Sequence, residues 1–533
     1  METGIRFDEA LYSIGGFSRY QLRSLLVLIL AIWQYSILIA GLPQFIQLPS
    51  IQCNKTGNLA SCMEFDICKY KYPYTFEFQR FQSIVYEWRL ICEYHYMIYI
   101  ITGCFIGSLL IGTLLIGKLA ERLGRANVLR WTTALTTLGE FLILAAGDAW
   151  YFMVILIFIT IMLPGMFMMP IVYLTEITSF RSRNISLMIL ICMCTVGYLP
   201  AYLLMYYFYS WRPIVLGSMG CGFFSFLFSW MLVESPRYLA VIMARYTKAR
   251  SAFEYIALTN KKPMFEVQLQ GEILNEYSET IRKRQGLDMS GLGMDASALP
   301  DAYEIRDNEH EESNRDAIAP FEYLGGAANA VDRESDLDRG HKYNYLDLFR
   351  EDLRKIALVM MLIWVIQGCV IYSYMHSGYI LIDPYMNVVL HVILSIIGFF
   401  ICGITSLFVK TKKIMMWLAV LAGVFALAQG IMLLMGKNSQ EAFALGVVAI
   451  SGFYYILVIY TVEIFPTPAR CIGLGFLNFF GILGIIAGYA IVFYVKEGLT
   501  AAGAALMLMP ILLLKMPETG GAPLNDFSVW APL

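Results

Sequence analysis

Two stretches of the chain repeat one arrangement of a carboxylate and a guanidinium. Glu176 is followed seven residues later by Arg183, and Glu463 is followed seven residues later by Arg470, a shift of 287 residues. In both stretches an uncharged apolar run ends in Glu-Ile, the Arg follows, and a second apolar run begins at once. A carboxylate and an Arg at a membrane boundary can form charge-assisted hydrogen bonds, so each copy predicts a polar latch at a helix end.

A second pair of motifs recurs at a similar shift. Glu234-Ser-Pro-Arg237 closes one apolar run, and Pro517-Glu518-Thr-Gly closes another, 284 residues later. The chain is therefore predicted to contain two copies of one membrane unit. Parallel repeats of this kind are typical of proteins whose halves rock against each other around a central site.

Composition places these motifs in a membrane protein. The chain of 533 residues is 58% hydrophobic and only 15% charged, and its mean hydropathy is +0.61, which exceeds what a soluble core can absorb. Twelve charge-poor stretches are long enough for a helix to cross a hydrocarbon layer of about 30 Å. They are predicted at 24–46, 96–117, 128–147, 150–174, 185–208, 213–233, 356–379, 386–409, 414–435, 442–462, 471–495 and 498–516.

The spans divide the chain into two halves joined by polar loops. The predicted segments are an N-terminus at 1–23, a six-helix half at 24–233, a loop at 234–355, a second six-helix half at 356–516 and a tail at 517–533. Short loops after even-numbered spans hold ten Lys and Arg residues, whereas those after odd-numbered spans hold three. Because positive loops stay in the cytosol, both termini and the central loop are predicted to be cytosolic.

The outer loop at 47–95 contains four cysteines, which predicts two disulfides in an oxidising compartment. The sequence leaves three pairings open, with a zinc site as the alternative. The same loop carries an N-glycosylation sequon at Asn54. The cysteines are Cys53, Cys62, Cys68 and Cys92.

The central loop combines two kinds of sequence. Apolar residues at helical spacing up to about residue 285 predict amphipathic helices, and the insert at 285–342 is predicted to be disordered. Within it, residues 301–340 hold twelve Asp and Glu against four Arg. A segment of this composition buries too little apolar surface to offset the conformational entropy lost on ordering. This segment is expected to be a solvated linker or a docking segment for a protein partner.

Several classes of protein are excluded. The formal charge of −2 and the lack of a basic cluster argue against nucleic acid, which requires many neutralised phosphates. There is no Gly-rich phosphate loop, no His-Glu-x2-His pair and no Gly-x-Ser-x-Gly turn. We expect no enzyme activity, no cofactor and no metal, and the expected partners are a small organic solute and the lipid bilayer.

Five motifs stand in order along the predicted spans. They are Ile14-Gly-Gly-Phe-Ser-Arg-Tyr-Gln21, Val85-Tyr-Glu-Trp-Arg-Leu-Ile-Cys92, Gly117-Lys-Leu-Ala-Glu-Arg-Leu-Gly-Arg125, Val233-Glu-Ser-Pro-Arg-Tyr-Leu239 and Pro517-Glu-Thr-Gly-Gly-Ala-Pro-Leu524. Together they resemble the motifs of the organic cation, organic anion and carnitine transporters of the major facilitator superfamily. The resemblance covers nearly the whole chain apart from the acidic insert. It implies an all-α membrane protein with twelve transmembrane helices in two pseudo-symmetric halves.

The charged residues of these motifs are predicted to form a cytosolic gate that latches the halves in one state. The alternative is fixed capping of helix ends and anchoring of topology. The candidates are Glu121, Arg122, Arg125, Glu176, Arg183, Glu234, Arg237, Glu463, Arg470 and Glu518.

The sequence departs from the family pattern at several positions. Glu121 stands where the family usually has Asp, Ala126 replaces a basic residue, and the equivalent turn of the second half, 409–413, lacks the Gly-Arg-Arg pattern. Ile482 falls where the family usually has a charge-selecting Asp or Arg. Binding would then depend on apolar packing, stacking and hydrogen bonds.

Aromatic and polar side chains inside the spans are candidates for the walls of a central cavity. Glu140 is the only carboxylate well inside a span, and a structural role is favoured for it over a proton or cation site. The candidates for contact with a solute are Trp33, Tyr35, Phe167, Trp364, Gln367, Tyr372, Tyr454, Tyr455, Tyr460, Asn478 and Ile482.

The resulting hypothesis is a secondary transporter of a small organic cation, zwitterion or anion that works by alternating access. One alternative is a transport-inactive homologue that serves as a structural or accessory subunit, and another is a carrier similar to sugar porters. The expected location is the plasma membrane, with an internal membrane, including the mitochondrial inner membrane, as the alternative.

Overall fold

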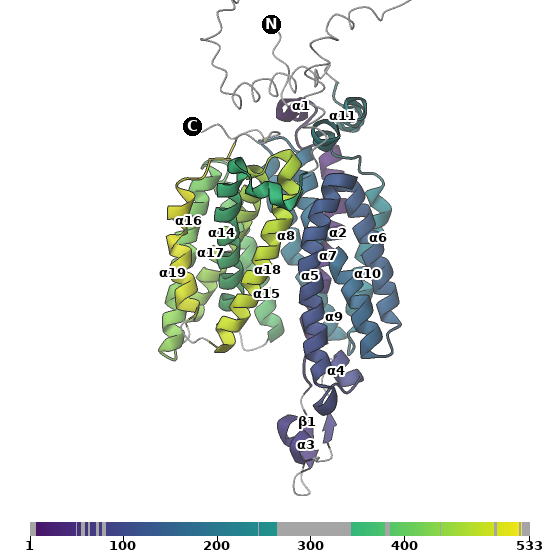
Figure 1. Cartoon of the computed structure of the whole chain (residues 1–533), viewed down its shortest axis with the longest axis vertical. Helices are drawn as coiled ribbons and strands as arrows, with labels where there is room; N and C mark the ends of the chain where they lie inside the picture. The colour runs from purple at the N-terminus through teal and green to yellow at the C-terminus, as the bar shows by residue number, and fades with distance from the viewer. Residues whose placement is uncertain are drawn as a thin grey trace, which may run out of the picture. The chain divides into compact units, whose positions relative to one another are not determined.

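A computed structural model describes residues 7–49, 51–54, 59–61, 64–70, 74–76, 82–243, 245–263, 343–378, 384–437, 439–494, 498–521 and 524. The predicted insert at 285–342, with its acidic part at 301–340, and Cys62 lie outside these residues. Figure 1 shows long helices in two neighbouring groups, one from each half of the sequence.

The first group covers the first six predicted spans. Its helices are α2 (Arg19–Phe45), α5 (Tyr96–Leu123), α6 (Arg125–Leu144), α7 (Ala149–Ile177), α8 (Arg183–Val196), α9 (Tyr198–Tyr207) and α10 (Arg212–Ser229). The second group is α14 (Glu351–Met375), α15 (Pro384–Thr405), α16 (Thr411–Leu434), α17 (Gln440–Ile464), α18 (Arg470–Tyr494) and α19 (Gly498–Leu513).

Ten helical segments in the described part of the chain are long and apolar enough to cross a membrane. The other two predicted spans correspond to α6 and α19. Helix α6 carries the charged residues Arg125, Arg130 and Glu140, and α19 has only 16 residues. Both still pack within their groups, α6 against α7 and α10 and α19 against α16, so each takes the place expected of a span.

The fifth predicted span, 185–208, is not one continuous helix. It breaks at Gly197 between α8 and α9, where a Cβ atom would lie 2.8 Å from Cβ of Ser36 and 3.0 Å from Cδ1 of Trp33. Because Gly197 has no side chain, helix α2 can pack directly against the backbone at this break.

A second glycine shapes the turn between α5 and α6. Gly124 has a φ of +100°, and a Cβ there would lie 2.3 Å from Oε2 of Glu234. Glycine adopts this backbone conformation without steric cost. The tight turn therefore brings Glu121, on the last turn of α5, and Arg125, the first residue of α6, close together.

The two halves meet along α5 and α18 and along α8 and α15. Gly475 on α18 faces α5 so closely that a Cβ would lie 2.6 Å from the Thr113 carbonyl oxygen. On α5, a Cβ at Gly117 would lie 2.8 Å from the Cys471 carbonyl oxygen. Small residues let helix backbones touch, so these glycines determine how closely the halves approach.

The outer loop forms a small antiparallel sheet. Its strands are β1 (Ile51–Asn54), β2 (Leu59–Ser61) and β3 (Tyr74–Phe76), in the order β2-β1-β3. Cys53 pairs in register with Ala60 on one side and Tyr74 on the other. The loop also contains α3 (Glu64–Tyr70), α4 (Ile84–Glu87) and η1 (Cys92–Tyr94).

A disulfide between Cys68 and Cys92 joins α3 to η1, which is one of the pairings that the sequence leaves open. Cys53 is also disulfide-bonded. Glycosylation of Asn54 stays a prediction.

The motif residues Glu87 and Trp88 hold the loop on the first half. Two guanidinium nitrogens of Arg212 donate to the Glu87 carboxylate at 2.8 Å each, and so does Nε1 of Trp211. The Trp88 ring packs edge-on against Phe152 and Trp211. Aromatic burial and a bidentate ion pair thus both hold the outer loop against the helices of the first half.

Short elements gather at the opposite end of the helices (Figure 1). They are α1 (Phe7–Ser13), the π-helix η2 (Tyr238–Ile242), α11 (Tyr246–Asn260), η4 (Tyr345–Phe349) and η5 (Thr467–Ala469). Phe253 and Ile256 of α11 are buried, as its helical periodicity predicts, and the Phe253 ring meets Phe7 of α1.

Candidate cytosolic gate and solute site

The two copies of the Glu-Arg motif pair crosswise. Nη1 of Arg470 lies 3.0 Å from Oε1 of Glu176, and Nη1 of Arg183 lies 3.7 Å from Oε1 of Glu463. All four side chains are almost completely buried. Each Arg therefore reaches the carboxylate of the other half rather than its own.

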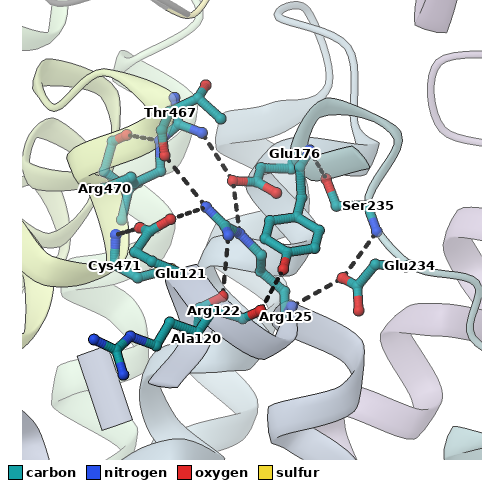
Figure 2. A network of polar contacts seen from close by, with 12 residues as sticks. Ala120, Glu121, Arg122, Arg125, Glu176, Glu234, Ser235, Thr467, Arg470 and Cys471 are labelled. Carbon is teal, nitrogen blue, oxygen red and sulfur yellow. Dashed lines mark hydrogen bonds and ion pairs between the residues drawn. The ribbon is translucent and has the colours of Figure 1, made fainter. Parts of the chain in front are cut away.

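Arg125 extends this network (Figure 2). Its Nε donates to Glu176 at 3.3 Å, and its Nη2 lies 3.1 Å from Oε2 of Glu121 and donates to the Thr467 carbonyl at 3.2 Å. Glu121 also accepts a hydrogen bond from the backbone N–H of Cys471 at 3.0 Å. Helix α5 and the start of α6 are thus tied to η5 (Thr467–Ala469) and to the start of α18.

The 284-residue repeat appears as two matching helix caps. Glu234 accepts hydrogen bonds from the backbone N–H groups of Arg125 and Ala126, the first residues of α6. Glu518 accepts one from the N–H of Lys412, near the start of α16. A carboxylate at a helix N-terminus satisfies free N–H groups and favours the helix dipole. Burial raises the pKa of Glu234 above its ordinary value, although these N–H groups oppose the shift.

Two tyrosines repeat the same symmetry. The Tyr173 hydroxyl donates to the Val233 carbonyl at 2.6 Å, and the Tyr460 hydroxyl donates to the Pro517 carbonyl at 2.7 Å. These contacts bind the last turns of α7 and α17 to the segments that hold the capping glutamates. Tyr460 therefore lies beside the gate network, although the sequence suggested it for the solute site.

Asp8 is a member of the network that the sequence analysis missed. Its carboxylate lies 2.7 Å from Nη2 of Arg183 and 2.8 Å from Nη2 of Arg237, and it accepts the N–H of Leu524 at 2.9 Å. Burial alone would raise the pKa of Asp8, but the two guanidinium groups outweigh it and hold the pKa below its ordinary value. Because no repeat contains Asp8, only the tertiary structure reveals this link between the two ends of the chain.

Arg122 lies outside this network. Its side chain is exposed, and its carbonyl oxygen accepts a hydrogen bond from the Tyr238 hydroxyl at 3.0 Å. Its predicted part in the gate stays a prediction.

Candidate solute contacts form one aromatic pair in each half. Tyr35 stacks on Phe167 with ring centroids 5.2 Å apart, and Trp364 meets Tyr454 edge-on at 6.3 Å. Tyr198, which the sequence did not select, packs against the same hydrophobic core of the first half as Tyr35. We call Tyr35, Phe167, Tyr198, Trp364 and Tyr454 the aromatic cluster.

Two other tyrosine candidates lie apart from this cluster. The Tyr455 hydroxyl donates to the Asn184 carbonyl at 2.9 Å, at the contact between the halves, and the ring is fully buried. Tyr372 stacks on His376 with centroids 4.1 Å apart, near the end of α14. These contacts fit structural packing.

The remaining polar candidates already have partners. Nε1 of Trp33 donates to the Met193 carbonyl at 2.9 Å, and Nε2 of Gln367 donates to the Ile450 carbonyl at 3.3 Å. Nδ2 of Asn478 donates to Leu474 of its own helix at 3.2 Å. Ile482 is partly buried on the same helix, α18.

Glu140 is fully buried inside the first half. It accepts a hydrogen bond from Nε2 of Gln34 at 2.8 Å and contacts the Ser218 hydroxyl. No cationic side chain pairs with it among the described residues. These neutral partners satisfy the carboxyl group within one half, which supports the structural role favoured by the sequence.

Comparison with known proteins agrees with this architecture. A family profile described as "Sugar (and other) transporter" matches residues 53–288. The chain is 22% identical to organic cation/carnitine transporter 2 of Homo sapiens over 463 residues, covering 83% of this chain and 71% of that protein. It is 25% identical to solute carrier family 22 member 15 of Xenopus tropicalis over 475 residues, covering 84% of this chain and 74% of that protein.

A more local match, 28% identical over 179 residues, is to solute carrier family 22 member 4 of Mus musculus and covers 33% of this chain and 32% of that protein. Among solved structures, the major facilitator superfamily proton:xylose symporter XylE bound to 6-bromo-6-deoxy-D-glucose has a TM-score of 0.62 at 13% identity, over 97% of this chain and 98% of that one. At this identity the likeness shows the fold alone. The chain therefore has the fold of this transporter and is similar in sequence to the organic cation and carnitine transporters.

Proposed function

We propose that the chain moves a small organic solute across the membrane by alternating access, with the two helix groups rocking about the aromatic cluster. The observation that carries the proposal is the crosswise pairing of Arg470 with Glu176 and of Arg183 with Glu463. Because each pair joins one half to the other, opening the cytosolic end must break both pairs.

Burial makes these contacts suitable as a latch. Two charges removed from water are costly unless they are paired, and loss of one partner from a buried pair costs about 3–5 kcal/mol. The pairs therefore favour two discrete arrangements, paired and separated, over intermediate ones. The described structure has the paired arrangement, with the cytosolic ends of α5 and α18 in contact.

The aromatic cluster indicates the chemistry of the solute. Phe167 and Trp364 are nearly buried, while Tyr35 and Tyr454 are partly exposed. Because Ile482 on α18 is uncharged and partly buried, we infer that ring faces are the main recognition surface. A planar neutral solute, or a cation of diffuse charge that binds over ring faces, fits this surface better than a compact anion.

Uptake into proteoliposomes containing the purified chain tests this proposal. The panel should contain an aromatic quaternary ammonium, a zwitterionic betaine, an aromatic carboxylate and a pentose. We expect the aromatic cation to enter, and Tyr454→Leu should raise its KM by about 3- to 30-fold, the loss of one cation–π contact. Tyr207→Leu is the matched control because Tyr207 is 69% exposed and lies outside the cluster.

Two results would contradict the proposal. Selective uptake of the pentose would favour a carrier similar to sugar porters. No uptake of any compound, together with stable copurification of other subunits in mild detergent, would favour a transport-inactive accessory subunit.

A further inference from the structure

A basic cavity lies at the cytosolic end of the first half, beside the gate. Its volume is about 840 Å³, and its walls come from the end of α5, the start of α6, the segment after α10, η2 and α11. Glu234 is its single acidic lining residue. The basic lining residues are Arg122, Arg130, Arg245 and Lys248.

In the described part of the chain, one acidic side chain lines this cavity against four basic ones. Glu234 is already engaged in capping α6. Arg130 donates to neutral acceptors, among them the Ser229 carbonyl at 3.2 Å and the Asn127 side chain at 2.6 Å. Arg245 and Lys248 are exposed and form no ion pair with any described residue. The cavity thus carries an excess of positive charge that an anion can satisfy.

The residues around the cavity indicate that it lies at the level of lipid headgroups. Trp230 is 67% exposed, and the Arg130 guanidinium lies 5.3 Å from its ring centroid. Leu123, at the rim, is 48% exposed. Exposed tryptophans gather at the membrane interface, and basic side chains near it extend toward phosphates. Leu239 and Met243 add apolar surface to the wall.

We propose that this cavity binds the phosphorylated headgroup of an anionic phospholipid, of the phosphoinositide class. Arg and Lys side chains bind phosphate oxygens through charge-assisted hydrogen bonds, and basic pockets on the cytosolic side of membrane proteins bind such headgroups. Ser251 and Tyr255 also line the cavity, where the Ser251 hydroxyl donates to the Lys248 carbonyl at 2.9 Å and the Tyr255 hydroxyl accepts from Arg23 at 3.1 Å. The volume falls within the range of about 300–1,000 Å³ that is usual for small-ligand pockets.

Native mass spectrometry of the full chain in mild detergent tests the proposal. The probe is dioctanoyl phosphatidylinositol 4,5-bisphosphate, in competition with dioctanoyl phosphatidylcholine. We expect selective binding of the phosphoinositide to the native chain. Arg245→Gln with Lys248→Gln should weaken that binding by about 30-fold, the loss expected for two basic residues near an anionic headgroup.

The control double variant is Lys261→Gln with Lys262→Gln. It removes the same charge from exposed residues beyond the end of α11 that do not line the cavity, and its lipid binding should be unchanged. Equal weakening in both variants, or no weakening in either, would overturn the proposal.

Two further outcomes would also overturn it. If free inositol 1,4,5-trisphosphate binds as tightly as the lipid, the cavity binds a soluble phosphate. If lipid binds only after residues 301–340 are deleted, the acidic segment of the chain itself is the occupant.

Discussion

Arg470 at the start of α18 and Glu176 at the end of α7 form a buried ion pair of 3.0 Å that joins the two halves of the chain. Both side chains are fully buried. Glu176 is the carboxylate of the first repeat, and Arg470 is the guanidinium of the second. The pair therefore forms only because the two halves pack against each other. Any motion that separates the halves at this end must separate these two groups.

Arg470→Gln should loosen the cytosolic end. Cys471 is fully buried and supplies a reporter, in a background where the other free cysteines are replaced by Ser. Loss of one partner of a buried pair costs about 3–5 kcal/mol, so we expect labelling of Cys471 by a maleimide to accelerate by at least about tenfold.

Arg122→Gln is the matched control for this experiment. It removes one guanidinium from the same end of the chain, but from an exposed side chain outside the network. Equal labelling rates in the two variants would contradict the assignment of Arg470 to the gate.

Gly475→Val should prevent the halves from closing at the cytosolic end. A Cβ at this position would lie 2.6 Å from the Thr113 carbonyl oxygen, a backbone atom that cannot rotate away. We expect persistent labelling of Cys471 and loss of uptake, with a normal size-exclusion profile. Gly107→Val on α5 is the control, because a Cβ there meets nothing within 4 Å; a similar loss of uptake in it would refute the packing argument.

Asp8→Asn should destabilise the protein at neutral pH. The carboxylate pairs with Arg183 and Arg237, and its removal leaves two buried guanidinium groups poorly compensated. We expect a loss of about 3 kcal/mol, measured as a lower Tm and faster proteolysis of the N-terminus. Glu9→Gln, one residue away and exposed, should change neither quantity. If Glu9→Gln lowers the Tm as much as Asp8→Asn does, the loss does not come from the ion pairs of Asp8.

The contact between Glu87 and Arg212 should depend on pH in a defined direction. Burial raises the pKa of Glu87, but hydrogen bonds from Arg212 and Trp211 outweigh this effect, and the pKa lies below its ordinary value of 4.5. A carboxylate with a lowered pKa contributes stability above its unfolded pKa and loses it as pH falls through the folded one.

Glu87→Gln should therefore lower stability by about 1 kcal/mol at pH 7, a modest figure because the ion pair is partly exposed. The difference in Tm between this variant and the native chain should stay constant from pH 7 to about pH 5 and close at more acidic pH. If the difference in Tm already disappears near pH 6, a group other than Glu87 determines this pH dependence.

Much of the architecture could be predicted from the order of residues. Long apolar runs must form helices in a membrane, because every backbone group needs an internal partner there. The duplicated motifs at Glu176 and Glu463 predicted charged contacts at corresponding helix ends, and the pair at Glu234 and Glu518 predicted equivalent surroundings. The break at Gly197 was missed because the apolar run continues through it.

What the sequence determined by itself is therefore local: membrane-length helices, a repeated unit and charges at the ends of particular spans. Only the tertiary structure decided which charge meets which, because pairing across the halves depends on their packing and not on distance along the chain. The same is true of Asp8, which meets Arg183 and Arg237 although they lie far away in the sequence. Such contacts depend on the approach of helix surfaces at Gly117 and Gly475, where the absence of a side chain, rather than its chemistry, allows the backbones to meet.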